Sequence, residues 1–302
     1  MSGSVYAVLP ALARFDQIPQ LKRRLARADA LKPGARHELA VGDGFQWPGD
    51  SLPVAALIRE HVVHDAGEHV WLCADLAHCE PDMTGVRVLA IGSLTLTAAD
   101  AEALAAPLRP LFGDSGMPLE TTLPSRWHLR LPADAPLPQM EAPGDVLGDD
   151  LARHLPEGAA GRRWRQILNE TQIVLHQHAL NRQRAQQGQS TVNSLWLWGA
   201  GRLPAWVKAN VAVAYGDDLL LAALADKAGV PLQPLDALPT TQPLPHDVLL
   251  DLGGSTDPAA CSELLLGLLD GKQADALTLH FAGGERWRLT RAQRWRFWRH
   301  AA

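Results

Sequence analysis

The feature that most constrains the fold is an alternation of apolar strands with helices in the second half of the chain. Two stretches show almost no alternation of polar and apolar residues, SLWLW at 194–198 and DVLLDL at 247–252. This pattern is typical of strands covered on both faces. Helical patterns separate such strands, most clearly at 258–270. This order predicts an α/β fold with a mostly parallel sheet flanked by helices. A Gly283-Gly284 turn then predicts an antiparallel strand at the edge.

The first half of the chain predicts an additional N-terminal α+β region. Strand patterns occur there, and Thr97 with Asp100 forms a capping-box pattern at the start of a helix. Four prolines lie between residues 132 and 145, and proline interrupts helices and strands alike. We therefore expect an N-terminal region over 1–131, a proline-rich linker over 132–148 and a C-terminal region over 149–302. The two regions can still share one sheet.

Composition excludes several classes of protein. The net charge is −5, so the chain as a whole does not attract nucleic acid, and we expect no nucleic-acid partner. Three widely spaced cysteines make no disulfide framework, which indicates a reducing cytoplasm. Cys73, His78 and Cys79 lack the CxxC spacing that is typical of structural zinc. No apolar stretch is long enough for a transmembrane helix, so we expect no membrane partner.

The stretch NSLWLWGAGRLP, residues 193–204, raises the main functional question. It predicts a buried strand, then a Gly199-Ala200-Gly201 turn, Arg202 and a helix that begins near Pro204. Such a turn is able to bind an anion through backbone N–H groups, the helix N-terminus and the guanidinium. The pattern equally fits a tight turn with a surface arginine, because no third glycine completes a dinucleotide fingerprint.

This part of the chain resembles the cofactor-independent, archaeal-type phosphoglycerate mutases, which carry an Asn-x-x-Arg…Gly…Asn…Trp-Gly-x-Gly-Arg pattern. The matching positions are Asn181, Arg184, Gly188, Asn193, Trp198, Gly199, Gly201 and Arg202. From about residue 69 to 300 the chain also resembles a proteobacterial phosphoglycerate-mutase-like group, the regulatory proteins of the RpfE type. That likeness rests on CADLAHCEPD with Asp75 and His78, on LTLTAADAEAL, on RWHLRL and on the basic, aromatic C-terminus.

The resemblance implies an alkaline-phosphatase-like fold, and in an active mutase it implies two divalent metal ions, Mn or another, together with a serine nucleophile. The sequence departs from that pattern. Pro10 follows the first strand where an Asp-Gly is expected, and Cys261 follows Asp257 where a histidine is expected. Ala282-Gly283-Gly284 replaces an Asp-His pair. Asp251, Asp257 and Cys261 are the remaining candidate metal ligands, and Ser51 and Ser255 are nucleophile candidates only by default.

We therefore expect a non-catalytic, regulatory relative of the mutases without a cofactor. It would bind a small phosphorylated or carboxylated metabolite, or a protein partner. The resemblance assigns the metabolite to the matched residues Asn181, Arg184, Asn193, Gly199, Gly201 and Arg202. The first alternative is an active metal-dependent phosphoglycerate mutase.

The second alternative is an interaction module for protein or nucleic acid that uses the C-terminal segment ERWRLTRAQRWRFWRH. Interleaved arginine and tryptophan side chains are able to stack on bases and to bind phosphates. The alternation in RWRL instead favours Trp287 and Leu289 packing inward while Arg286 and Arg288 face water. Trp295 and Trp298 would then form a core stripe on a terminal helix. His178, which follows the apolar stripe of helix 162–188, is likewise expected to be a hydrogen-bonded core histidine.

Overall fold

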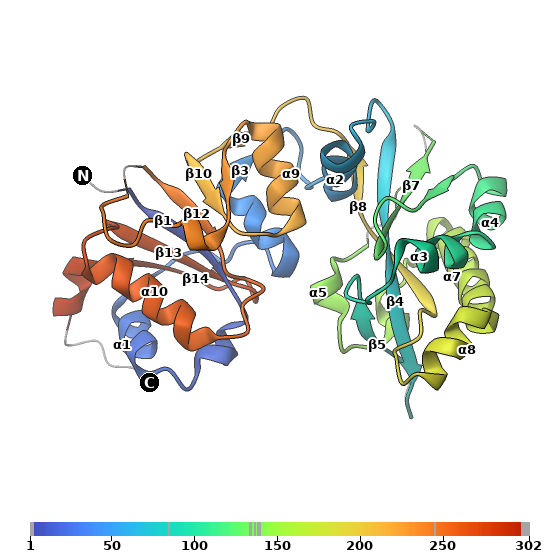
Figure 1. The fold of residues 1–302 in the computed structure, drawn as a ribbon, viewed down its shortest axis with the longest axis horizontal. Helices are drawn as coiled ribbons and strands as arrows, with labels where there is room; N and C mark the ends of the chain where they lie inside the picture. Colours follow the sequence, from blue (N-terminus) through green and yellow to red (C-terminus); the bar gives the residue numbers. More distant parts are fainter. Residues whose placement is uncertain are drawn as a thin grey trace. The chain divides into compact units, whose positions relative to one another are not determined.

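The computed structural model describes residues 3–83, 85–132, 135, 137, 140–244 and 246–296. It is an α/β protein in which the chain forms two compact units (Figure 1). One unit, here called the discontinuous unit, combines residues 1–49 and 205–302. The other, the inserted unit, comprises residues 50–204.

These units divide the chain at other places than the expected linker at 132–148. Strand β7 (Arg126–Leu131) precedes that segment and β8 (Ser194–Arg202) follows it, yet both pair with β4 (Val70–Pro81). One sheet therefore joins the two sides of the segment, as the sequence left open. Part of the segment is itself helical, in α5 (Pro143–Val146).

The discontinuous unit contains the mostly parallel sheet that the strand–helix alternation predicts. Its strand order is β11-β10-β12-β1-β13-β14-β2, in which β11 to β13 run parallel and β14 and β2 are antiparallel at one edge. The strands of this sheet are β1 (Val5–Leu9), β2 (Asp29–Ala30), β10 (Val213–Tyr215), β11 (Leu232–Gln233), β12 (Val248–Asp251), β13 (Ala276–Phe281) and β14 (Arg286–Thr290). The helices of the unit are α1 (Pro19–Arg27), α9 (Leu219–Ala228) and α10 (Pro258–Asp270), with 3₁₀ segments at Leu12–Phe15, His37–Gly44, Leu235–Ala237 and Arg291–Trp295.

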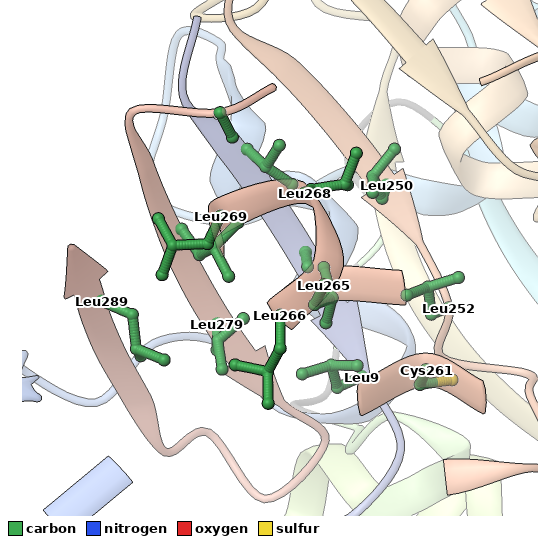
Figure 2. Close-up of a cluster of buried hydrophobic side chains, with 14 of the residues drawn as sticks. Leu9, Leu250, Leu252, Cys261, Leu265, Leu266, Leu268, Leu269, Leu279 and Leu289 are labelled. Carbon is green, nitrogen blue, oxygen red and sulfur yellow. The ribbon is translucent and has the colours of Figure 1, made fainter. Parts of the chain in front are cut away.

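One face of this sheet is an apolar core against α10. Asp257 caps the helix by accepting the backbone N–H groups of Ala259 and Ala260, and Pro258 occupies the first turn. The leucines of α10 then point at the strands, as Figure 2 shows for Leu265 and Leu269. Each buried leucine contributes about 1.5–3 kcal/mol, so this contact holds the helix to the sheet.

The opposite face of the same sheet is polar at its centre. Because side chains alternate along a strand, the register that aligns Tyr6 with Thr278 and Thr278 with Arg288 places these three on one face. The 3₁₀ segment His37–Gly44 contacts β1 and β13 and packs close to this sheet, since a Cβ on Gly44 would lie 2.5 Å from the Leu249 side chain.

The inserted unit has an antiparallel sheet built around β4. Strands β5 (Val86–Ile91), β7 and β8 all pair with β4, and β6 (Leu119–Glu120) pairs with β7. Its helices are α2 (Val54–Val63), α3 (Ala98–Ala105), α4 (Leu108–Asp114), α5, α6 (Leu151–His154), α7 (Gly158–Gln177) and α8 (Ala179–Gln186). A two-stranded ribbon of β3 (Phe45–Gln46) and β9 (Lys208–Ala209) belongs to the discontinuous unit.

Helices cover both faces of the inserted unit's sheet. Residues from α3, α4 and α7 share one apolar cluster with Leu72, Leu129 and Leu197. Helix α2 packs on β8 and β4. Burial on both faces explains why β4 and β8 lack polar alternation although their pairing is antiparallel. Among the described residues, no helix combines the length and the apolar character that a membrane span needs.

Candidate functional site

The stretch 193–204 is the end of an antiparallel strand rather than a strand-to-helix turn. Strand β8 runs through Gly199 and Gly201 to Arg202, and it pairs with β4. No helix begins near Pro204 in the described part of the chain. The predicted helix near Pro204 is therefore wrong, and the anion site expected at this turn lacks the helix N-terminus that was to support it.

Gly199 and Gly201 serve the packing of α2. Gly199 has a φ of +64°, and a Cβ at that position would lie 2.8 Å from the Cβ of Val54. A Cβ on Gly201 would lie 2.5 Å from the Cβ of Pro53. The two glycines thus allow the N-terminus of α2 to approach the strand. Arg202 donates to the backbone oxygen of Glu68, 2.5 Å away, at this same end of β8.

Asn181 and Arg184 support the backbone around α8. The buried Asn181 amide donates to the backbone oxygens of Leu175 and Val192 and accepts the N–H of Val192. Arg184 is also buried and donates to the backbone oxygens of Ser190 and Thr95. Both side chains are satisfied by the protein itself, so the matched motif fixes the chain between α7 and β8.

Asn193 attaches the start of β8 to the end of β4. Its side chain accepts the N–H of Cys79 at 2.8 Å and donates to the carbonyl of Cys79 at 2.6 Å. Arg202 lies at the other end of β8, about 25 Å or more away at the rise of an extended strand. The predicted site residues are therefore not brought together: Asn181 and Asn193 lie at one end of β8, and Gly199, Gly201 and Arg202 at the other.

A groove at the first of these ends is the candidate site. It has a volume of about 810 Å³, and a second lobe of about 710 Å³ shares Cys79, Pro81, His176, Gln177 and Asn193 with it. Its walls come from the end of β4, from α7 and α8, and from the loop that leads into β8. Asn181 and Asn193 both line it. Its size is typical of sites for small molecules.

His78 is held in one orientation at this groove. Its Nε2 lies 3.0 Å from the Glu80 carboxylate, and its Nδ1 lies 3.2 Å from the Thr191 hydroxyl. The histidine that the family resemblance singled out beside Asp75 therefore forms part of the groove wall.

The titratable groups along the groove are mostly basic. Arg182 and His176 join His78 in the lining, and the one carboxylate among the lining residues is that of Glu80. Arg182 donates to the carbonyl of Gln177 at 2.6 Å, which places its guanidinium across the α7–α8 junction. Together with the exposed amides of Gln177 and Gln189, these groups suit a ligand rich in hydrogen-bond acceptors.

The candidate metal ligands do not fit a bimetallic centre. Asp257 is occupied as the N-cap of α10, and Cys261 packs in the apolar core beside Leu9 (Figure 2). Asp251 accepts the N–H of Gly253, and burial raises its pKa to about 6, with the nearby Asp217 and Asp218 adding to the effect. Across the described segments, no three His, Cys, Asp or Glu side chains gather as a ligand set.

The cysteines near His78 are also poor ligands. Cys73 and Cys79 are buried, and burial raises the pKa of both thiols, that of Cys79 to about 11. A thiol with such a pKa remains protonated at neutral pH and does not bind a metal readily. His178, by contrast, is hydrogen-bonded as expected, although it is only half-buried and not part of the core. It accepts the N–H of Leu180 as the cap of α8, and its Nε2 lies 3.1 Å from the carbonyl of Ala103.

The C-terminal segment is partly built into the discontinuous unit. Leu289 is buried and Trp287 packs edge-on against Phe281, as the alternation predicts. Arg286 does not face water alone, because it contacts the hydroxyl of Tyr6 and the carboxylate of Asp43. The predicted core stripe is wrong for Trp295, which is 65% exposed, and Trp298 lies outside the described residues.

Sequence reasoning missed most of the groove because its walls are far apart in the chain. Glu80, His176 and Arg182 approach one another only when β4 and the α7–α8 pair form the same unit. No local spacing relates residues 78–81 to residues 176–193. The available signals were the family-like Ala-Asp-x-x-His pattern at 74–78 and the matched motif that contains Asn181 and Asn193.

Comparison with known proteins gives a partial likeness. A segment of 62 residues is 39% identical to a probable 2,3-bisphosphoglycerate-independent phosphoglycerate mutase of Geobacter sulfurreducens and covers 20% of this chain. A segment of the same length is 32% identical to the enzyme of Methanosarcina mazei. In both cases the match spans 16% of the relative's length. No family model matches the chain.

Solved structures give a wider but looser match. A protein of Pyrococcus horikoshii aligns with 96% of this chain and 87% of its own at a TM-score of 0.43 and 13% identity. The cofactor-independent phosphoglycerate mutase of Thermoplasma acidophilum aligns with 96% of this chain and 89% of its own at a TM-score of 0.36, again with 13% identity. The chain is thus an α/β protein of which one fifth is distantly similar in sequence to cofactor-independent phosphoglycerate mutases.

Proposed function

We propose that this protein is a non-catalytic relative of the cofactor-independent phosphoglycerate mutases. It binds a small phosphorylated or carboxylated metabolite in the groove between the end of β4 and the α7–α8 pair. Its role is regulatory, in keeping with the resemblance to the RpfE-type group. This ligand site replaces the one expected at the 199–202 turn.

The observation that carries the proposal is the basic, amide-rich lining of the groove. His78, His176 and Arg182 face a single carboxylate, that of Glu80. An anionic ligand gains charge-assisted hydrogen bonds from the Arg182 guanidinium, and these are about twice as strong as neutral ones. The similarity of one segment to phosphoglycerate mutases supports a phosphorylated three-carbon acid as the first ligand to test.

The non-catalytic part rests on what the candidate catalytic residues do instead. Asp257 caps a helix and Cys261 fills the core, so neither is free to change partners without loss of stability. Phosphoryl transfer through two metal ions needs several carboxylate and imidazole ligands at one place. Because these side chains stabilise the fold and do not hold metal ions, the function that we propose is binding alone.

Calorimetric titration of the full chain with 3-phosphoglycerate, 2-phosphoglycerate, glycerate and inorganic phosphate tests the proposal. We expect at least one to bind, and Arg182→Gln to weaken it about tenfold, the effect of losing one charge-assisted hydrogen bond. Arg153→Gln is the matched control, because this exposed arginine of the same unit does not line the groove.

Two outcomes would contradict the proposal. One is that none of the four compounds gives heat or raises the melting temperature. The other is that the chain, supplied with Mn²⁺, interconverts the two phosphoglycerates at the rate of an enzyme, which would establish the metal-dependent mutase instead.

A further inference from the structure

A second cavity lies in the discontinuous unit, at the amino ends of the parallel strands. It has a volume of about 300 Å³ and is lined by residues of β1, β13 and β14, by Asp43, and by the residues that precede β10 and β12. Ligands of α/β sheets usually bind at the carboxyl ends of the strands, so this cavity is at the opposite end. It is also separate from the groove of the inserted unit, with which it shares no residue.

The charge of Asp43 in this cavity is already balanced. Its carboxylate lies 3.2 Å from Nη1 of Arg286 and 3.2 Å from Nδ1 of His280. His280 is fully buried, its Nε2 lies 2.7 Å from the carbonyl of Ala35, and burial lowers the pKa of the ring. Asp43 and Arg286 therefore form a pair without net charge at one side of the cavity.

Two neutral hydroxyl groups line the middle of the cavity. Arg286 donates to the Tyr6 hydroxyl, and burial raises the pKa of Tyr6, so the hydroxyl retains its own proton for another acceptor. Thr278 is aligned with Tyr6 on the adjacent strand. Both groups thus present O–H donors to whatever occupies the cavity.

Two opposite charges remain at the edges. Within the described ranges, the Arg288 guanidinium has no ion pair or hydrogen bond, and the Asp247 carboxylate accepts only the N–H of Ser4, at 2.6 Å. Both side chains are exposed and both line the cavity. Arg288 belongs to β14, whereas Asp247 directly precedes β12, and β1 and β13 lie between these strands. Three strand spacings separate their backbones by about 14 Å.

We infer that this cavity binds a small zwitterion of the free amino acid class, with its carboxylate at Arg288 and its ammonium group at Asp247. The hydroxyl groups of Tyr6 and Thr278, on the two strands between β12 and β14, donate to the carboxylate. A phosphate or a dicarboxylate would bring further negative charge next to Asp247 and Asp43, and a diamine would bring positive charge next to Arg288. The volume lies at the lower limit for ligand pockets, which favours a small compound.

Calorimetric titration of the full chain with glycine, β-alanine and γ-aminobutyrate tests this inference, because their charges are increasingly far apart. Acetate and ethylammonium supply each charge alone. We expect at least one amino acid to bind about tenfold or more tightly than either single-charge compound. Arg288→Gln and Asp247→Asn should each weaken that binding about tenfold, by removing one charged partner.

Arg23→Gln is the matched control, since Arg23 is an exposed arginine of the same unit on α1 and bonds only within its own helix. Circular dichroism verifies that all three variants are folded. The inference is overturned if no amino acid binds, if acetate, ethylammonium or inorganic phosphate binds as tightly as the best amino acid, or if Arg288→Gln binds as Arg23→Gln does.

Discussion

Asp75 shows how strongly a single buried charge ties the inserted unit together. Its carboxylate is fully buried, accepts two hydrogen bonds of 2.8 Å from Arg126, and accepts a third of 2.9 Å from the indole of Trp198. Removing one charge of a buried ion pair costs about 3–5 kcal/mol. We therefore expect Asp75→Asn to lower the free energy of unfolding by about that amount, measured by urea denaturation.

The control for this prediction is Glu102→Gln, which removes the carboxylate of an exposed ion pair with Arg109. Exposed pairs are screened by water, so its loss of stability should be much smaller. Equal effects of the two substitutions would mean that the Asp75 network contributes no more than a surface pair.

The burial of Asp251 predicts that the stability of the folded protein depends on pH, and in which direction. Burial raises its pKa to about 6 from the ordinary value of 3.8. Between these values the folded state binds more protons than the unfolded state, so stability falls as pH rises from about 4 to above 6. A pKa difference of this size corresponds to roughly 3 kcal/mol.

The substitution Asp251→Asn removes this titration while its side-chain oxygen can still accept the N–H of Gly253. We expect the variant to be more stable than the natural protein at pH 8, by roughly 2–3 kcal/mol, and equal or less stable at pH 4. Guanidinium unfolding curves at several pH values measure both. A difference that does not change with pH would show that Asp251 does not titrate in this way.

Among the elements, those with local end signals were predictable and those set by tertiary contacts were not. Helix α10 spans 258–270 as predicted, because Asp257 and Pro258 determine its start. The capping box of Thr97 and Asp100 is likewise present. The predicted helix over 162–188 instead breaks at His178, whose ring caps α8. Nothing in the local pattern of apolar residues indicates that break.

Strand β8 and its glycines allow an element-scale test of close packing. Gly199 and Gly188 both have positive φ, +64° and +70°, but only at Gly199 would a Cβ meet another residue, Val54 at 2.8 Å. Alanine costs about 1–2 kcal/mol at such a φ in either place. We expect Gly199→Ala to lower the melting temperature clearly more than Gly188→Ala, and the excess reports the contact of α2 with β8. Equal losses would mean that α2 adapts without cost.

For the whole molecule, the α/β class was predictable, whereas the division into units was not. Alternating strands and helices sufficed for the class. The division depends on β1 pairing with β12 and β13, more than 200 residues later in the chain, and neither partner carries a mark that identifies the other. The expected linker at 132–148 was inferred from proline content alone. The matched motif indicated the groove residues Asn181 and Asn193, whereas Arg182 is not one of its positions.

The arrangement of the two units predicts that each folds by itself. Each has its own apolar core cluster, and residues 50–204 are continuous in sequence. The chain leaves the discontinuous unit after β3 and returns at β9, and these strands pair, with Gln46 opposite Lys208. The two ends are therefore close enough for a two-residue Asn-Gly turn, the loop that antiparallel strands prefer, to replace the inserted unit.

We expect residues 50–204 alone, and residues 1–47 joined to 207–302 through Asn-Gly, each to unfold cooperatively in calorimetry. The first fragment should keep the ligand binding proposed for the groove, and the second that proposed for the cavity beside Arg288. As a control, residues 1–131 and 149–302 follow the proline-rich boundary and separate β7 from β8. This cut separates β4 from β8, and β1 from β12 and β13, so both fragments should lack a cooperative transition. The reverse result would place the boundary at the prolines and refute the division into an inserted and a discontinuous unit.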